Sequence, residues 1–173
     1  MNDIILFETE RLTMIIASPH HAQFLCDLYH TPEINKFYSV YGWHTPEDAL
    51  NKMINHHGLP HYQKHGFSMC IIREKSSKKL IGICGMVKRD FLDAPNLGYA
   101  LLPEYWGKGY IHESCLGLVE ICRKFGFKKL YSNCDPSNVR SEKVALRLGM
   151  VMKSDSFPWG SDDDLRYLYG MDL

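Results

Sequence analysis

The residues most able to do chemistry lie around two glycines, Gly107 and Gly109, which follow an apolar segment and precede an amphipathic one. Glycine has no Cβ, so the backbone there can turn tightly and approach a ligand closely. Backbone amides at the start of the following helix have no partner within the helix and lie at its positive end. A strand, a glycine turn and a helix start would therefore suit a pyrophosphate, although a turn that needs glycine for geometry alone has the same sequence.

The composition favours a single globular domain spanning residues 1–173. Hydrophobic residues make up 45% of the chain and charged residues 23%, which is ordinary for such a domain. Lys and Arg total 20, as do Asp and Glu, so the formal charge is zero. Neutrality argues against binding to nucleic acid or an anionic membrane. No apolar run approaches a membrane span, and Asp3, Glu8 and Glu10 do not suit a signal or transit peptide, so we expect a cytoplasmic protein.

The cysteines and histidines do not indicate a metal centre. No two cysteines form a CxxC pair, and we interpret them as core thiols in a reducing compartment. His61 and His65 have metal-ligand spacing on a helix, but no carboxylate or cysteine joins them at a suitable interval. A solvated helix face is the favoured interpretation of the histidines, and we expect no metal. The six cysteines are Cys26, Cys70, Cys84, Cys115, Cys122 and Cys134.

Hydrophobic periodicity predicts an α+β fold around a mixed, mostly antiparallel sheet of seven strands. The element order is a strand, helices, three antiparallel strands, a helix, a strand, a helix and two strands. Gly58, Pro60 and Gly66 are expected to interrupt and end the early helices. The predicted strands are 9–16, 67–73, 80–87, 96–102, 129–134, 150–157 and 165–171.

Helix starts are indicated by cap residues. Thr31-Pro32-Glu33 and Thr45-Pro46-Glu47-Asp48 each combine a capping hydroxyl, a proline at the first turn and an acidic residue near the positive end. Asn138 stands before an apolar run that ends at Gly149, which again fits a helix cap. These signals predict helices in the 19–66 region, after the glycine loop and after Asn138.

Two other nucleotide-binding interpretations do not fit. A dinucleotide-binding fold needs GxGxxG in the first strand–helix unit of an alternating series, whereas only GxG is present, late in the chain. A phosphate loop of the nucleoside triphosphatases needs Ser or Thr after its lysine, and Lys108 is followed by Gly109.

The element order and two motifs resemble the Gcn5-related N-acetyltransferase (GNAT) superfamily and, within it, the RimJ/RimL-like branch of ribosomal-protein N-terminal acetyltransferases. The opening residues 8–12 (ETERL) are similar to the start of that branch. Gly98-Tyr99 followed by residues 102–110 (LPEYWGKGY) is similar to its acetyl-CoA loop. The likeness covers nearly the whole chain. A second motif is matched by Asn138, Ser141, Val144, Leu148 and Gly149.

This resemblance implies an acyl-CoA site between strands 4 and 5 of the predicted sheet, which would splay apart. Acetyl-CoA would be the co-substrate, with its pantetheine arm held by backbone groups near Ala100, Leu101 and Leu102. Asn138 would bind the arm from the other side, unless it is an ordinary helix cap. The pyrophosphate would be held by the backbone amides of Gly107, Lys108, Gly109, Tyr110 and Ile111, although the family prefers Gly or Ala where Ile111 stands.

The implied reaction is direct attack of a primary amine on the thioester. In this branch a serine at the position of Ser141 protonates or hydrogen-bonds the departing thiolate, although a serine near a helix start is also an ordinary polar position. The tyrosine more common in the superfamily is replaced by Ala145. Asn96 stands where the family often has a glutamate base, and an amide cannot take a proton, so the base is another residue or a chain of waters. Glu113 matches a common family glutamate and is either a catalytic residue or a structural one. Other possible bases are Asp90, Asp93, Glu104, His112 and Tyr99.

The acceptor is least determined by the sequence. By resemblance it is a protein N-terminus or a small amine, bound by a monomer or homodimer, with helices from the 19–66 region forming the wall. Tyr38, Tyr41 and Trp43 either line this site or belong to the core. The run Asp162–Asp164 either attracts a cationic amine or is a solvated hairpin tip. An alternative function is an acyl-CoA-binding regulatory module with little or no catalysis.

Overall fold

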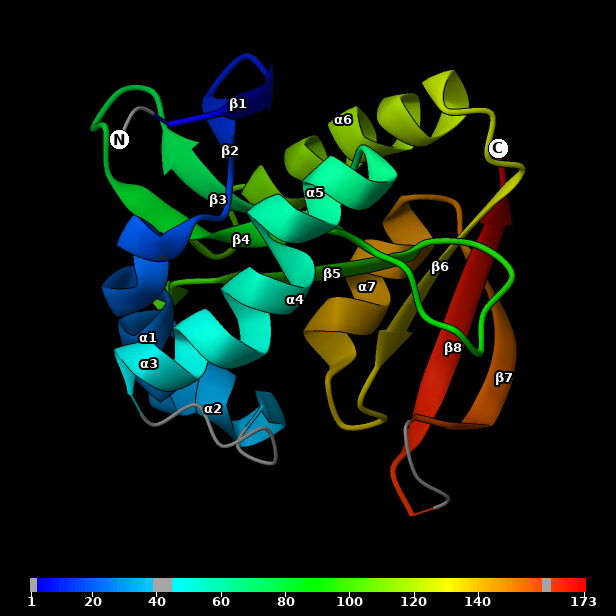
Figure 1. The fold of residues 1–173 in the computed structure, drawn as a ribbon. Coiled ribbons are helices and arrows are strands. Elements are labelled where there is room, and N and C mark those ends of the chain that lie inside the picture. Colours follow the sequence, from blue (N-terminus) through cyan, green and yellow to red (C-terminus); the bar gives the residue numbers. More distant parts are fainter. Residues whose placement is uncertain (1–2, 39–44, 160–162) are drawn as a thin grey trace.

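The computed structural model describes residues 3–38, 45–159 and 163–173, and its strands form one eight-stranded sheet (Figure 1). The strand order is β1-β2-β3-β4-β5-β6-β8-β7. All neighbours are antiparallel except β5 and β6, which are parallel. The strands are β1 (Ile5–Glu8), β2 (Leu12–Ile16), β3 (Met69–Glu74), β4 (Leu80–Val87), β5 (Asn96–Leu101), β6 (Lys129–Cys134), β7 (Val151–Pro158) and β8 (Leu165–Asp172).

The prediction of seven strands was wrong by one strand. The predicted first strand is only its second half, β2, and a separate edge strand, β1, precedes it. The amide of Thr9 donates to the carbonyl of Leu12 in the turn between them. Because β1 begins with three consecutive apolar residues and ends at Glu8, with Ile5 exposed on the edge, it lacks the polar–apolar alternation by which a half-buried strand is recognised.

Helices cover both faces of the sheet (Figure 1). The hydrophobic cluster on one face joins β2–β5 to α6 (Tyr110–Lys124) and α7 (Val139–Arg147). The cluster on the other face joins the same strands to the N-terminal helices. These helices are η1 (Pro19–His21), α1 (Ala22–His30), α2 (Pro32–Tyr38), α3 (Pro46–Ala49), the π-helical turn η3 (Leu50–Ile54), α4 (Asn55–His57) and α5 (Leu59–His65); the short 3-10 turn η4 (Pro103–Tyr105) follows β5.

The helix starts and breaks agree with the sequence signals. Thr45 caps α3 through its side chain, which accepts from the amide of Asp48, and Asp48 returns the bond. Gly58 separates α4 from α5, and Gly66 ends α5 with φ of 79°. All six cysteines are buried and none forms a disulfide, as predicted for core thiols. Within the described residues, every helix is too short or too polar to cross a membrane.

The sheet opens between β5 and β6, as the resemblance implied. The two strands pair only at Asn96–Tyr131 and Leu97–Ser132, next to their N-terminal ends. Beyond Leu97 they diverge (Figure 1), although β5 stays paired with β4 as far as Leu101. The backbone of β5 that would otherwise face β6 therefore faces a gap.

Candidate active site at the open edge of β5

A cavity of about 870 Å³ lies at the point where the sheet opens. One part, here called the loop end, is lined by residues of the glycine loop and α7. Another part, here called the helical end, is lined by α2, η3, α4 and the segments after β4 and β7. Representative residues are Gly107, Gly109, Ile111, Asn138 and Ser141 at the loop end, and Glu33, Phe37, Met53, His57, Arg89 and Trp159 at the helical end.

The glycine loop uses its glycines for backbone conformation. Gly107 and Gly109 have φ of 74° and 80°, in the left-handed region that disfavours residues with a Cβ. A Cβ on Gly107 would meet nothing within 4 Å, so crowding is not the reason for glycine there. The left-handed turn directs the chain into α6, whose first bond joins the amide of Glu113 to the carbonyl of Gly109.

The loop presents the start of α6 to the cavity. The amides of Tyr110, Ile111 and His112 are in the first turn, where no intrahelical acceptor exists. Gly107, Gly109, Tyr110 and Ile111 all line the cavity. Lys108 does not: its side chain is exposed, with Nζ 5.0 Å from the ring centre of Tyr105. A role for Lys108 would therefore rest on its backbone amide, as predicted, and not on its charge.

The register of β4 and β5 determines which backbone groups face the gap. The amide of Leu102 donates to the carbonyl of Ile81 on β4. Because hydrogen-bonded and non-bonded pairs alternate in an antiparallel ladder, Ala100 also directs its backbone to β4, and Leu101 directs its own away from β4. Of the three residues predicted to bind pantetheine through the backbone, Leu101 has the groups that face the gap.

Trp106 already forms a hydrogen bond with one of the two backbone groups of Leu101 that face the gap. Its Nε1 donates to the carbonyl of Leu101 at 2.6 Å, so a ligand would meet the Leu101 amide and the indole instead of that carbonyl. The guanidinium of Arg140 lies over the face of the indole, 4.4 Å from the ring centre. Trp106 thus links η4 and β5 to α7 across the opening.

Asn138 acts as a helix cap, the alternative left open from the sequence, and also lines the cavity. Its Oδ1 accepts from the amide of Ser141 at 3.2 Å at the start of α7. The capping bond uses the amide oxygen and leaves Nδ2 as the donor that a ligand in the cavity could meet.

Ser141 lies in the first turn of α7, and its hydroxyl is close to that of Tyr99 on β5. Tyr99 Oη is 3.0 Å from Ser141 Oγ and donates to the backbone carbonyl of Ser141 at 3.1 Å. Both residues line the cavity. The only hydroxyl predicted to meet the departing thiolate is therefore held in place by a tyrosine that the sequence suggested only as one of several bases.

Glu113 points away from the cavity. Its carboxylate accepts from the hydroxyl of Thr9, from the amide of Arg11 at 3.0 Å and from Arg11 Nε at 2.7 Å. Burial alone would raise the pKa of Glu113, but these bonds from Thr9 and Arg11 outweigh it and lower the pKa. Arg11 Nη1 donates onward to the carbonyl of Lys108 at 3.0 Å. This geometry gives Glu113 a structural role, since it ties the β1–β2 turn to the glycine loop.

Asn96 is buried, with 3% exposure, and lines the cavity at the start of β5. Within the described structure its Oδ1 has no hydrogen-bond partner. Of the other bases considered, Asp93 is paired with Lys129 at 2.8 Å, and Asp90 and Glu104 are exposed and do not line the cavity. His112 and Tyr99 do line it.

The helical end contains side chains that the sequence did not single out. His57 is half-buried there, and burial followed by the charge of Arg89 lowers its pKa to about 4, so the ring is neutral at pH 7. Arg89 itself lies over the ring of Trp159, 5.5 Å from its centre. These residues come from three distant segments, and only the order in which the strands pair brings them together.

The predicted solvated histidine face was wrong for His61, which is buried. Its Nδ1 bonds the carbonyl of Phe67 at 2.7 Å, and its Nε2 accepts from the amide of Lys88 at 3.2 Å. Both ring nitrogens therefore bond α5 to backbone groups just before β3 and just after β4. His65 packs against His61 with ring centres 4.5 Å apart.

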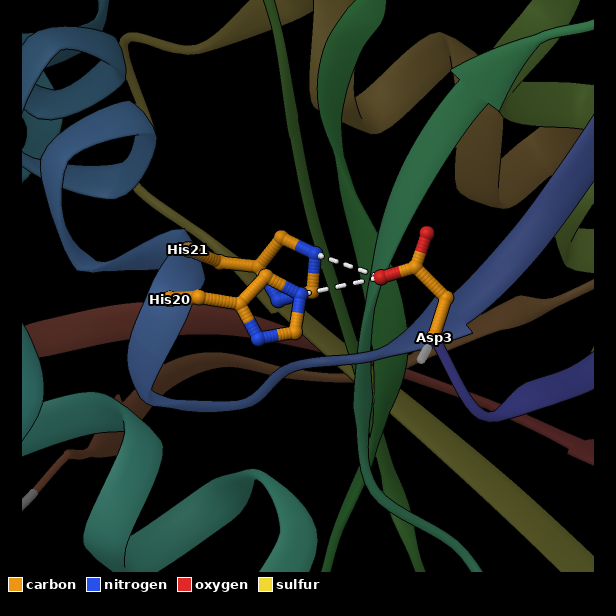
Figure 2. Close-up of side chains that lie close together, drawn as sticks. All are labelled: Asp3, His20 and His21. Atoms are coloured by element: carbon orange, nitrogen blue, oxygen red, sulfur yellow. Dashed lines mark hydrogen bonds and ion pairs between the residues drawn. The ribbon is translucent and has the colours of Figure 1, made fainter. Parts of the chain in front are cut away.

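A second cluster of polar side chains, Asp3, His20 and His21, lies outside the cavity (Figure 2). Both imidazoles point at one carboxylate oxygen of Asp3, with His20 Nε2 at 2.9 Å and His21 Nε2 at 3.5 Å. The amide of Ser18 donates to His21 Nδ1, which leaves Nε2 as the protonated nitrogen that faces the carboxylate. Arg73 pairs with the other oxygen at 2.8 Å. These contacts thus hold the segment before β1 against η1 and β3.

Some predictions concern residues outside the described ranges. Tyr41, Trp43 and Asp162 are among these residues, as is the side chain of Tyr38. Asp164 is described, and its carboxylate is paired with Arg166 next to the β7–β8 hairpin, while Asp163 is exposed.

Comparison with known proteins agrees with this geometry. The family model for the acetyltransferase (GNAT) domain matches residues 11–151, from β2 to the start of β7. The chain belongs to this family. An uncharacterised N-acetyltransferase of Bacillus licheniformis, p20, is 29% identical over 147 residues, which cover 79% of this chain and 76% of that protein. This GNAT protein is thus an N-acetyltransferase by family.

Solved structures share its fold at low sequence identity. An acetyltransferase from Agrobacterium tumefaciens strain C58 has a TM-score of 0.77 at 19% identity, covering 100% of this chain and 95% of its own. RimL, a ribosomal L7/L12 α-N-protein acetyltransferase solved with coenzyme A, has a TM-score of 0.79 at 16% identity, covering 98% of both chains. At these identities the likeness establishes the shared fold.

Proposed function

We propose that this GNAT protein transfers an acetyl group from acetyl-CoA to a primary amine, on a protein N-terminus or a small molecule, as one domain spanning the chain. The observation that carries the proposal is the opening of the sheet after Leu97, directly beside a left-handed glycine loop that leads into α6. The resemblance to the RimJ/RimL-like branch, and the similar fold of RimL, which was solved with coenzyme A, support the same placement of the cofactor.

The pantetheine arm lies in the gap between β5 and β6. There it pairs with β5 in the place that β6 has left. The Leu101 amide faces this gap and donates to the arm, with Asn138 Nδ2 opposite. The pyrophosphate lies at the loop end, where the amides from Gly107 to Ile111 and the positive end of α6 favour an anion. We assign Ala100 and Leu102 to packing and to the β4 ladder, and Glu113 to holding the loop.

The reaction has two proton transfers to arrange. An aliphatic ammonium must lose a proton before it can attack, and the departing thiolate must gain one. Ser141 donates to the thiolate from the first turn of α7. The buried Asn96 carries no charge and cannot take a proton, and the lowered pKa of His57 makes that ring a weak base, so the proton of the amine leaves through water in the cavity.

The test combines binding and turnover. Coenzyme A is expected to raise the melting temperature, because a ligand that binds only the folded state stabilises it. Acetyl-CoA with a panel of peptide N-termini and small amines is expected to release free thiol in an amine-dependent manner. Binding without thiol release for any amine would favour the regulatory module instead. Absence of a melting shift would contradict both functions.

A further inference from the structure

Tyr99 and Ser141 connect two elements on opposite sides of the opening. Tyr99 belongs to β5, at a position where this strand has already parted from β6, and Ser141 belongs to α7. The phenol oxygen is within hydrogen-bond distance of two atoms of the same serine, Oγ at 3.0 Å and the backbone carbonyl oxygen at 3.1 Å. Both side chains are partly buried and line the cavity.

The phenol has a single hydrogen for these two acceptors. When it donates to the Ser141 carbonyl, Oη can accept the hydrogen of Ser141 Oγ, and the serine then donates to the tyrosine. When it donates to Oγ instead, the serine hydrogen is available to a ligand in the cavity. Both arrangements use the same heavy-atom positions, so a small rotation of two hydroxyl hydrogens exchanges them.

We propose that Tyr99 is a positioning residue that turns the Ser141 hydroxyl toward the thioester sulfur and resupplies its proton. The inference rests on the proposed function, because it needs a thiolate leaving group beside Ser141. Donation from Tyr99 to Oγ polarises the serine hydroxyl and makes it a stronger donor than an isolated serine. A tyrosine hydroxyl has a far lower pKa than a serine hydroxyl, so it is the better ultimate source of the proton.

In the acetyl transfer, the amine nitrogen bonds the carbonyl carbon, and the carbon–sulfur bond breaks with its electron pair on sulfur. The thiolate takes the proton of Ser141 Oγ as Oγ takes the proton of Tyr99, and the phenolate recovers a proton that the amine has lost through solvent. The products are the acetylated amine and coenzyme A thiol, with one net proton released when the amine enters as ammonium.

A purely structural strut between β5 and α7 is the competing explanation of this contact, and the chain offers a matched control for it. Tyr169 Oη donates to Glu142 Oε1 at 2.8 Å, so a second tyrosine holds α7 at the residue next to Ser141. Tyr169 does not line the cavity. Tyr169→Phe therefore removes a tyrosine–α7 bond without touching the proposed relay.

The experiment measures kcat, KM for acetyl-CoA and melting temperature for Tyr99→Phe, Ser141→Ala, the double variant and Tyr169→Phe. General acid catalysis contributes about 100-fold or more, so Ser141→Ala is expected to lower kcat by about 100-fold. Tyr99→Phe is expected to lower kcat by about 10-fold with KM unchanged, since it weakens this donor without removing it. The double variant should be no slower than Ser141→Ala, because Tyr99 acts only through Ser141.

The results separate the alternatives. Independent, multiplicative losses in the double variant, or a Tyr99→Phe variant as fast as wild type, would overturn the relay while leaving acetyl transfer intact. A loss of kcat in Tyr169→Phe as large as in Tyr99→Phe would make the contact a strut and also overturn it. Wild-type protein that releases no thiol would contradict the proposed function itself, and the relay with it.

Discussion

The two ends of the cavity are lined by different kinds of group. The loop end consists of backbone: amides at the start of α6, the gap-facing amide of Leu101, and two glycines with positive φ. The helical end consists of side chains from α2, α4 and the segments after β4 and β7, including Glu33, His57 and Trp159. A backbone site can be the same in proteins whose side chains differ widely, whereas a side-chain site changes with each substitution.

This difference explains how far the site could be predicted from the sequence. Gly107, Gly109, the Thr45 cap and Asn138 each impose a local backbone geometry, and the local sequence is enough to indicate it. Arg89 reaches the ring of Trp159 only because β4 and β7 lie where the sheet order places them. Similarly, β1 was missed because its pairing with β2 depends on tertiary contacts and not on alternation.

Glu113 illustrates the same limit at the loop end. Its place in the first turn of an amphipathic helix was visible in the sequence, but its partners Thr9 and Arg11 lie more than 100 residues away. Family resemblance left a catalytic and a structural role open for Glu113, and its contacts with Thr9 and Arg11 favour the structural one. The direction of a side chain therefore needed the structure even where its backbone position did not.

The largest expected effect tests whether the loop end depends on backbone conformation. Gly107→Ala and Gly126→Ala both place a Cβ at positive φ, 74° and 76°, with nothing within 4 Å, at opposite ends of α6. Each should cost about 1 kcal/mol of stability. Only Gly107→Ala should also weaken coenzyme A binding, by about 10- to 100-fold, if an amide bond to the pyrophosphate is lost. Calorimetric titration measures the affinities, and equal affinities would contradict the backbone site.

The second-largest effect tests whether the contacts of Glu113 with Thr9 and Arg11 are structural. Glu113→Gln removes a charged acceptor of three hydrogen bonds and should lower the free energy of unfolding by about 2 kcal/mol. Turnover by the folded variant should change less than threefold, because the carboxylate faces Thr9 and Arg11 and not the cavity. Urea unfolding and steady-state kinetics give the two quantities. Turnover slowed by about 100-fold without destabilisation would restore Glu113 as a catalytic base.

A smaller effect concerns the helical end and pH. The pKa of His57 is lowered to about 4 from 6.5, so between these values the unfolded chain binds a proton that the folded chain does not. Stability should therefore fall as the pH drops from about 6.5 toward 4, by about 1–2 kcal/mol from His57 at pH 5. His57→Gln should remove that part of the decrease. Urea unfolding at pH 7 and pH 5 checks the sign, and an unchanged pH dependence in the variant would refute it.

The smallest effect concerns the lysine of the loop. Lys108 contributes its backbone but not its exposed side chain to the loop end. Lys108→Ala should therefore change the dissociation constant of coenzyme A by threefold or less, consistent with a screened surface charge. Gly107→Ala provides the contrast in the same titration. A Lys108→Ala loss as large as that of Gly107→Ala would mean that charge, and not backbone, holds the cofactor.

A crystal structure with coenzyme A bound would test the backbone site most directly. We expect the pantetheine arm in the gap between β5 and β6, bonded to the Leu101 amide, with the pyrophosphate on the amides from Gly107 to Ile111. We also expect the sulfur beside Ser141 Oγ. Coenzyme A bound elsewhere, or an arm that leaves the Leu101 amide unbonded, would contradict the backbone site.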